Sequence, residues 1–180
     1  MNLFRTFFAI AAAGAVSLGA ADLSKALDAK RWTIVEATAA TENGALAVNM
    51  PIDHKSGKYP KYLVGWPRLY LLKLQNQEKD WSKAKAVSFD IKLEFTGATK
   101  NYVINFHVFC KEPGNPKEIS WAAPLVPALK NNAVNKIVLP LDKVKNLAGV
   151  TGFGFSISES RYKHGENLKF TISDLKLLEK

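Results

Sequence analysis

Cysteine and histidine are scarce in this chain of 180 residues, and their scarcity excludes several kinds of site. Cys110 is the single cysteine, so neither an internal disulfide nor a C-x-x-C redox or zinc site can form. The three histidines, His54, His107 and His164, lack the short spacing of a zinc motif. A G-x-S-x-G nucleophile elbow is also missing. Stability must therefore come from packing, and neither a metal hydrolase nor a serine or cysteine nucleophile is indicated.

Acidic residues are few compared with basic ones. The chain has 16 acidic and 25 basic side chains, which gives a formal net charge of +9. The basic residues are spread along the chain rather than massed in a stripe, so nucleic-acid binding is not predicted. The charge favours acidic partners, and uronic or sulfated polysaccharides are one such class.

A continuous apolar run occurs at the N-terminus. Arg5 precedes the apolar run from Phe7 to Leu18, and Gly19-Ala20-Ala21 follows it with small residues that suit cleavage. The run is shorter than the roughly 20 residues that a spanning helix needs. We therefore predict a signal peptide over residues 1–21, a mature single domain over 22–180, export to the periplasm or outside the cell, and no integral membrane association.

The mature chain has the rhythm of an all-β protein. After a helix-like opening over 22–30, runs of alternating, β-branched or aromatic residues are separated by turn signals at intervals of about 10–15 residues. The predicted strands are Trp32–Thr38, Ala45–Met50, Leu63–Leu74, Ala86–Phe95, Tyr102–Cys110, Asn135–Leu139, Thr151–Ser158 and Leu168–Leu177. This number of strands predicts a β-sandwich of jelly-roll type. A barrel is the alternative.

Alternation along these strands assigns side chains to faces, because successive strand residues point to opposite sides of a sheet. One strand is expected to bury Phe106, Val108 and Cys110 and to leave Asn105 and His107 on its other face. The predicted buried set of the segment before it is Val87, Phe89, Ile91, Leu93 and Phe95. A later segment is expected to bury Phe153, Phe155 and Ile157 and to oppose them with Gly152, Gly154 and Ser156. That small, polar face suits either a ligand or a closely packed neighbour.

One segment carries the strongest signal for a ligand site. Trp66, Arg68 and Tyr70 share a face by alternation. An aromatic ring covers the apolar face of a pyranose, and a guanidinium donates to hydroxyls or to a carboxylate. Asn105 and His107 are the predicted polar partners, and Trp121 is a second candidate platform. The alternative is that these rings belong to the core.

Enzyme chemistry finds weaker support. Retaining glycosidases need two carboxyl groups about 5–5.5 Å apart, whereas Asp90 and Glu94, four strand residues apart, are about 13 Å apart along the backbone. The Glu-x-Asp-x-x-Glu string of laminarinase-type hydrolases is absent. Jelly-roll alginate lyases use Arg, Gln or Asn, His and Tyr on one face. This chain offers such a set in Arg68, Asn105, His107 and Tyr70. The longer sequence motifs of that family are absent.

Several segments together resemble the galactose-binding-like β-sandwich of non-catalytic carbohydrate-binding modules. They are Asp80-Trp81-Ser82, Ala86–Ile91, Lys136–Leu141 with Val144–Leu147, Val150–Phe155 and Leu168–Leu177. The resemblance covers most of 32–177. It implies a sandwich that binds a polysaccharide or oligosaccharide without cleaving it.

The same resemblance implies a structural calcium ion held by an early acidic residue and by one in the last strand. Glu36 and Asp174 occupy those places, and oxygen ligands suit Ca²⁺. The family usually has two adjacent acids in the last strand, where this chain has Ser173 before Asp174. No other cofactor is expected. The predicted function is therefore exported, non-catalytic polysaccharide binding, with a polysaccharide lyase or glycoside hydrolase, or a structural envelope protein, as alternatives.

Overall fold

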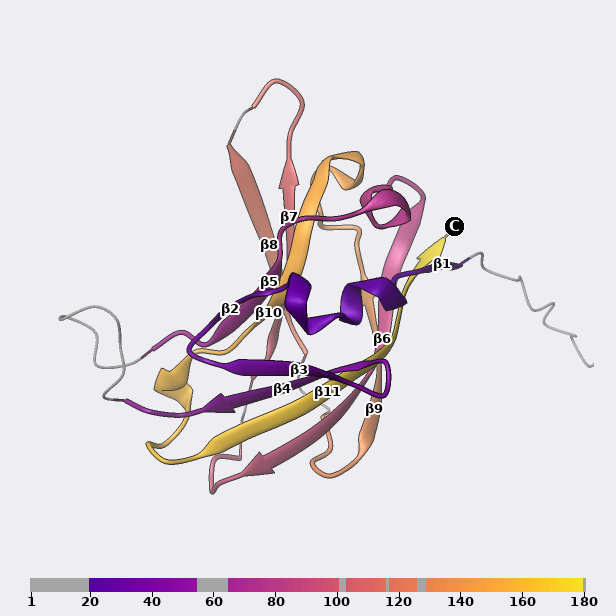
Figure 1. Ribbon diagram of the computed structural model, residues 1–180. Helices are drawn as coiled ribbons and strands as arrows, with labels where there is room; N and C mark the ends of the chain where they lie inside the picture. Colours follow the sequence, from indigo (N-terminus) through magenta and orange to yellow (C-terminus); the bar gives the residue numbers. More distant parts are fainter. Residues whose placement is uncertain (1–19, 55–64, 101–102, 116, 126–128, 180) are drawn as a thin grey trace, which may run out of the picture.

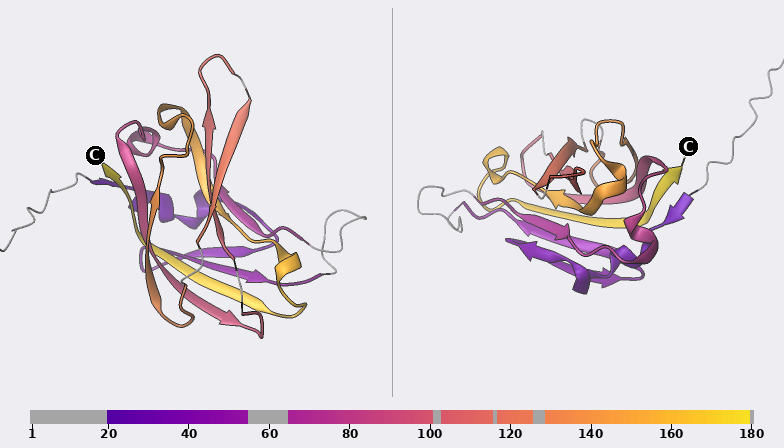
Figure 2. Two further views of the ribbon diagram at one scale, coloured as in Figure 1. Left: turned by 180° about the vertical axis from the view of Figure 1, so that it is seen from behind. Right: turned by 90° about the horizontal axis from the view of Figure 1, so that it is seen from above.

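The computed structural model describes residues 20–54, 65–100, 103–115, 117–125 and 129–179, whose strands form two antiparallel sheets packed face to face (Figures 1 and 2). The six-stranded sheet contains β1 (Ala20–Asp22), β3 (Thr38–Glu42), β4 (Ala45–Pro51), β6 (Ala84–Thr96), β9 (Val134–Pro140) and β11 (Asn167–Glu179). The five-stranded sheet contains β2 (Thr33–Val35), β5 (Arg68–Leu71), β7 (Asn105–Lys111), β8 (Glu118–Pro124) and β10 (Val150–Ser156). The predicted all-β sandwich of jelly-roll type is confirmed.

Strand order is not sequence order in either sheet. The orders are β3-β4-β11-β6-β9, with β1 also paired to β11, and β2-β5-β10-β7-β8. Strand β10 thus lies between β5 and β7, which come from distant parts of the chain. The connections contain short 3-10 turns: η1 (Ser24–Leu27), η2 (Ala29–Arg31), η3 (Asn76–Lys79), η4 (Leu147–Gly149) and η5 (Glu159–Arg161). Within the described residues, no helix is long and apolar enough to cross a membrane.

The core lies between the two sheets and consists of the side chains that alternation assigned to it. Phe89 of β6, Phe106 of β7 and Phe155 of β10 are fully buried. The rings of Phe89 and Phe155 make contact across the two sheets, with centroids 5.6 Å apart, and those of Phe106 and Phe155 make contact within the five-stranded sheet at 5.3 Å. Cys110 is buried among them as a small apolar residue. Most of the free energy of folding comes from this burial.

Several predicted boundaries were wrong. Strand β8 was missed because its residues include two alanines and end at a proline, which have weak strand propensity. Predicted strand Trp32–Thr38 is divided between β2 and β3, and the predicted opening helix is two 3-10 turns. Of predicted strand Leu63–Leu74, β5 keeps four residues, and Leu63 and Val64 lie outside the described residues. Tyr102 lies outside them as well.

The N-terminal part of the described chain runs beside the C-terminal strand. Ala20, Ala21 and Asp22 of β1 pair with Leu178, Leu177 and Lys176 of β11. Residues 1–19 of the predicted signal peptide lie outside the described residues, and the predicted cleavage position after Ala21 falls inside β1. The signal peptide stays a prediction.

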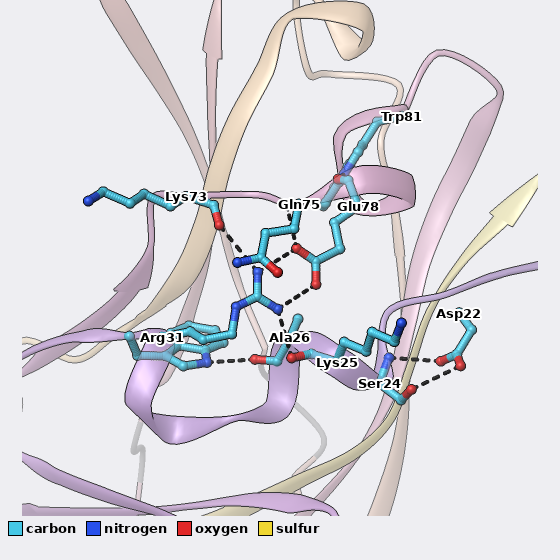
Figure 3. Close-up of polar contacts among 10 residues, drawn as sticks. Asp22, Ser24, Lys25, Ala26, Arg31, Lys73, Gln75, Glu78 and Trp81 are labelled. Atoms are coloured by element: carbon cyan, nitrogen blue, oxygen red, sulfur yellow. Dashed lines mark hydrogen bonds and ion pairs between the residues drawn. The ribbon is translucent and has the colours of Figure 1, made fainter.

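A bidentate ion pair fastens the first turns to the sandwich (Figure 3). Arg31 Nη1 and Nη2 each lie 2.6 Å from an oxygen of Glu78, and the exposed fractions of the two side chains are 14% and 6%. Arg31 also donates to the carbonyl oxygens of Lys25 and Lys73. Glu78 accepts in addition from the amide of Gln75. Turns η2 and η3, distant in sequence, are thereby joined.

A second buried carboxylate organises the opposite end of the long strands. Glu166, just before β11, is 7% exposed. One of its oxygens accepts from the amides of Ala98 and Thr99 at 2.8 and 2.9 Å, and the other accepts from the Thr99 hydroxyl at 2.6 Å and the Lys163 amide at 2.8 Å. Burial alone would raise the pKa of Glu166, but these hydrogen bonds outweigh it and lower the pKa to about 2.

This carboxylate should make stability depend on acid pH. Because the pKa of Glu166 in the folded state is below its ordinary value of 4.5, its ionised carboxylate stabilises the fold above pH 4.5. This stabilisation is lost as the pH falls toward 2. Glu166→Gln should cost about 1–3 kcal/mol at neutral pH, because the amide nitrogen that replaces one carboxylate oxygen cannot accept the hydrogen bonds made to that oxygen. Urea unfolding followed across that pH range should show a flatter curve for Glu166→Gln than for the wild type. The control Glu42→Gln removes an exposed carboxylate and should keep the wild-type slope, and equal slopes in all three proteins would contradict the assignment.

Candidate functional site

The outer face of the five-stranded sheet brings together most of the predicted ligand residues. Strand β10 pairs with β5 on one side and with β7 on the other, which places side chains of three strands in rows. Two adjacent rows carry the site: the first is Tyr70, Gly154 and His107, and the second is Arg68, Ser156 and Asn105. The sequence assigned these residues to faces, but only the register places them next to one another.

Three rings form an aromatic cluster on this face: Tyr70, His107 and Phe109. The Tyr70 ring centroid lies 5.5 Å from that of His107 and 4.9 Å from that of Phe109, both in edge-to-face contact. The His107 and Phe109 rings are stacked at 6.1 Å with an interplanar angle of 7°. Tyr70 and Phe109 are partly exposed. Such rings present flat apolar surface to a ligand.

Gly154 explains why the Tyr70 ring can lie over β10. A Cβ at residue 154 would stand 2.3 Å from the Leu69 carbonyl oxygen and 2.5 Å from Tyr70 Cδ1. The space left by this glycine is therefore filled by the ring of the neighbouring strand. Of the two roles predicted for the small face of β10, close packing of a neighbour is what the structure shows at this position. The ring becomes the surface that a ligand would meet.

Burial holds His107 in its neutral form. The residue is 7% exposed, and burial lowers the pKa of its imidazole. Its Nε2 atom is 2.7 Å from the hydroxyl of Ser156, which is fully buried. A neutral imidazole offers one donor and one acceptor. His107 can thus orient a hydroxyl group without carrying charge.

Trp66 and Arg68 extend the site beyond the first residues of β5. Trp66 lies two residues before Arg68, and 56% of its surface is exposed. Arg68 Nη1 donates to the Trp66 carbonyl oxygen at 3.0 Å. Within the described residues, no carboxylate forms an ion pair with Arg68. Burial raises the pKa of Tyr70, and the nearby charge of Arg68 partly opposes that shift.

Trp121 does not join this group. It pairs with Val108 in the β7–β8 ladder and shares the inner face of the sheet with it. Its side chain is partly buried and packs against the core. The residue belongs to a strand rather than to a loop, and strand parity points it away from Tyr70 and His107. The five remaining predicted ligand residues stay in the candidate site.

The sequence analysis did not select two residues that the structure adds. Phe109 completes the aromatic cluster, and Ser156 binds His107. Ser156 had been placed on the face opposite Phe155, and Phe109 shares the strand parity of Asn105 and His107. The usable signal was a large aromatic residue on the face that already carried Asn105 and His107.

Of the two predicted calcium ligands, Glu36 lies in the bend between β2 and β3, and Asp174 lies within strand β11. Glu36 follows β2, and its Oε2 atom accepts from the Trp66 amide at 2.6 Å. Asp174 lies in β11 and pairs with Lys176 at 2.9 Å. Both have positive φ angles, 55° and 51°. Among the described residues, no group of three or more metal-ligating side chains is assembled. Calcium binding stays a prediction.

A shallow groove of about 590 Å³ lies on the outer face of the other sheet. Small residues of β3, β4 and β11 form part of it, including Ala40, Ala47 and Thr171. Its charged side includes Lys92 and Glu94, which form an ion pair at 2.7 Å. Phe170 is the aromatic residue among its lining, and its side chain is buried in the core. The groove thus lacks the exposed rings that distinguish the five-stranded sheet.

Comparisons with known proteins bear on the fold. No protein-family model matches the chain, and no curated protein does. Among solved structures, a family 11 carbohydrate-binding module from Clostridium thermocellum, in complex with a β-1,3-1,4-mixed-linked tetrasaccharide, matches with a TM-score of 0.54 at 17% identity. The match covers 83% of this chain and 89% of that one.

Two further structures have the same architecture. A family 30 carbohydrate-binding module matches at 17% identity with a TM-score of 0.50, over 83% of this chain and 78% of that one. An exo-β-agarase matches at 12% identity with a TM-score of 0.51, over 83% of this chain and 23% of that one. The sandwich predicted from the resemblance to carbohydrate-binding modules is therefore confirmed as a fold. Fold by itself does not fix function.

Proposed function

We propose that this chain is an exported carbohydrate-binding protein that holds a polysaccharide on the outer face of the five-stranded sheet without cleaving it. The observation that carries the proposal is the aromatic cluster flanked by Arg68, Asn105 and Ser156 on adjacent strands. The structural likeness to carbohydrate-binding modules supports it at the level of fold.

Each side chain has a role that its chemistry supports. Tyr70 and Phe109 offer apolar ring surface to the C–H face of a sugar. Exposed Trp66 extends that surface at the start of β5. Asn105 and neutral His107 select hydroxyl groups by hydrogen bonding. An open face leaves much of the ligand solvated, so the affinity should be moderate.

We further propose that the glycan is acidic. Arg68 is a planar donor with several N–H groups, and one of its nitrogens binds the Trp66 carbonyl. The guanidinium binds carboxylates in a bidentate manner. The net charge of +9 adds long-range attraction for a polyanion. A uronic acid chain fits both features.

An enzyme is the second candidate. The face holds Arg68, Tyr70, Asn105 and His107 together, the kind of set that a polysaccharide lyase needs. The binding role is favoured because one ring nitrogen of His107 is already engaged by Ser156. A structural envelope role without a sugar ligand is the third candidate.

Affinity electrophoresis of the mature protein, residues 22–180, separates these candidates. The gels contain either polygalacturonate or neutral mixed-linkage β-glucan, and the same glycans are examined after incubation with the protein. Retardation on polygalacturonate with unchanged glycan is the expected result. Unsaturated uronate absorbance or new reducing ends would establish an enzyme. Normal migration on every gel would favour the envelope role.

A further inference from the structure

Two glutamates from distant parts of the chain hold the backbone just before β5. Glu36 Oε2 accepts from the Trp66 amide at 2.6 Å, and Glu159 Oε2 accepts from the Gly65 amide at 2.6 Å. Glu36 follows β2, and Glu159 begins η5. The other oxygen of Glu159 accepts from the amide of Asp53 at 3.3 Å. The segment that carries Trp66 is thus fixed from both sides.

Gly65 gives the two carboxylates their room. A Cβ on residue 65 would stand 2.4 Å from Glu36 Oε2 and 3.0 Å from Glu159 Oε2. Both acids therefore converge on the same α carbon, and any other residue would displace at least one of them. Glycine is required here for space.

Two features of this arrangement are energetically unfavourable. Glu36 adopts a φ angle of 55°, a left-handed conformation that is unfavourable for a residue with a Cβ. Glu159 is 1% exposed, and burial, together with the nearby charge of Glu36, raises the pKa of its carboxyl group. Backbone strain such as that of Glu36 persists where the surrounding structure fixes it, and it clusters at functional sites.

The peptide groups on both sides of Trp66 are fixed by charged side chains. Its N–H donates to Glu36, and its carbonyl oxygen accepts from Arg68 at 3.0 Å. The indole itself remains 56% exposed. A large exposed ring on an immobilised backbone loses less conformational freedom when a ligand binds, which increases affinity.

We propose that Glu36 and Glu159 are positioning residues that fix Trp66 at the edge of the ligand face, and so strengthen sugar binding without touching the sugar. This inference rests on the proposed function. The inference adds Glu36 and Glu159 to the site, and neither was among the predicted ligand-binding residues.

A ligand-free measurement tests the positioning itself. Protein labelled with 5-fluorotryptophan gives one ¹⁹F resonance for each of the four tryptophans, and Trp66→Phe identifies that of Trp66. Glu36→Ala, and Gly65→Ala, which retains both carboxylates, should shift or broaden the Trp66 resonance alone. Glu36→Gln keeps an oxygen that can accept from the Trp66 amide and should leave the spectrum unchanged. An unchanged Trp66 resonance in Glu36→Ala would overturn the proposal.

A double-mutant cycle on polygalacturonate gels tests the consequence for binding. Glu36→Ala should weaken retention by about tenfold in the wild-type protein and have no effect in a Trp66→Ala background, because it acts through that ring. Equal weakening in both backgrounds would mean a structural role and reject the inference. Normal migration of the wild type would instead refute the proposed function, and the ¹⁹F result would still decide whether the glutamates position Trp66.

Discussion

Trp66→Ala and Tyr70→Ala should each weaken retention on the polysaccharide gel by about thirtyfold, which is about 2 kcal/mol, and the double variant should abolish it. The reason is that each ring supplies flat surface for stacking in an otherwise polar site. Trp66 is 56% exposed, so its removal should change the free energy of unfolding by less than about 0.5 kcal/mol. Retention and urea unfolding of the same samples separate the two effects.

Matched variants sharpen this test. Tyr70→Phe keeps the ring and its contacts with His107 and Phe109, so it should retain most of the affinity. Trp121→Ala removes a ring from the inner face and should lower stability rather than affinity. Full retention by the Trp66 and Tyr70 double variant would move the ligand to another surface. The groove beside Lys92 and Thr171 would then be the one to mutate.

Glu78→Ala should lower the free energy of unfolding by about 3–5 kcal/mol, because it leaves Arg31 partly buried without its bidentate partner. The variant also removes the acceptor of the Gln75 amide (Figure 3). Chemical denaturation at neutral pH measures the loss. A decrease of this size is a large fraction of the about 5–15 kcal/mol by which folded domains are stable.

The exposed ion pair of Lys92 and Glu94 provides the control. Its side chains are 53% and 48% exposed, so Glu94→Ala should leave the free energy of unfolding nearly unchanged. Replacing Arg31 and Glu78 together with Met and Leu should cost less than Glu78→Ala alone, since no unpaired charge then remains. If Glu78→Ala proved no more harmful than Glu94→Ala, the ion pair would not fasten the first turns.

Strand parity predicted which face of its strand each residue of the candidate site occupies, but not which residues of other strands lie beside it. Arg68 and Tyr70 were assigned to one face, as were Asn105 and His107, and both assignments agree with the register. Parity failed for Trp121 because strand β8 had not been recognised, so no face could be assigned to that residue. The contribution of Phe109 required knowledge of its neighbour across β10. A cluster of residues from different strands can be predicted only when the order of the strands in the sheet is known.

The sequence by itself determined the fold class and the buried face of each recognised strand, because alternation with a period of two is a local property. The tertiary structure alone decided that β10 lies between β5 and β7, and that the Tyr70 ring covers Gly154. It also decided that Glu36 and Glu159 meet at Gly65. Strand order and register depend on pairing between segments far apart in the chain, and no local pattern of residues encodes which segments pair.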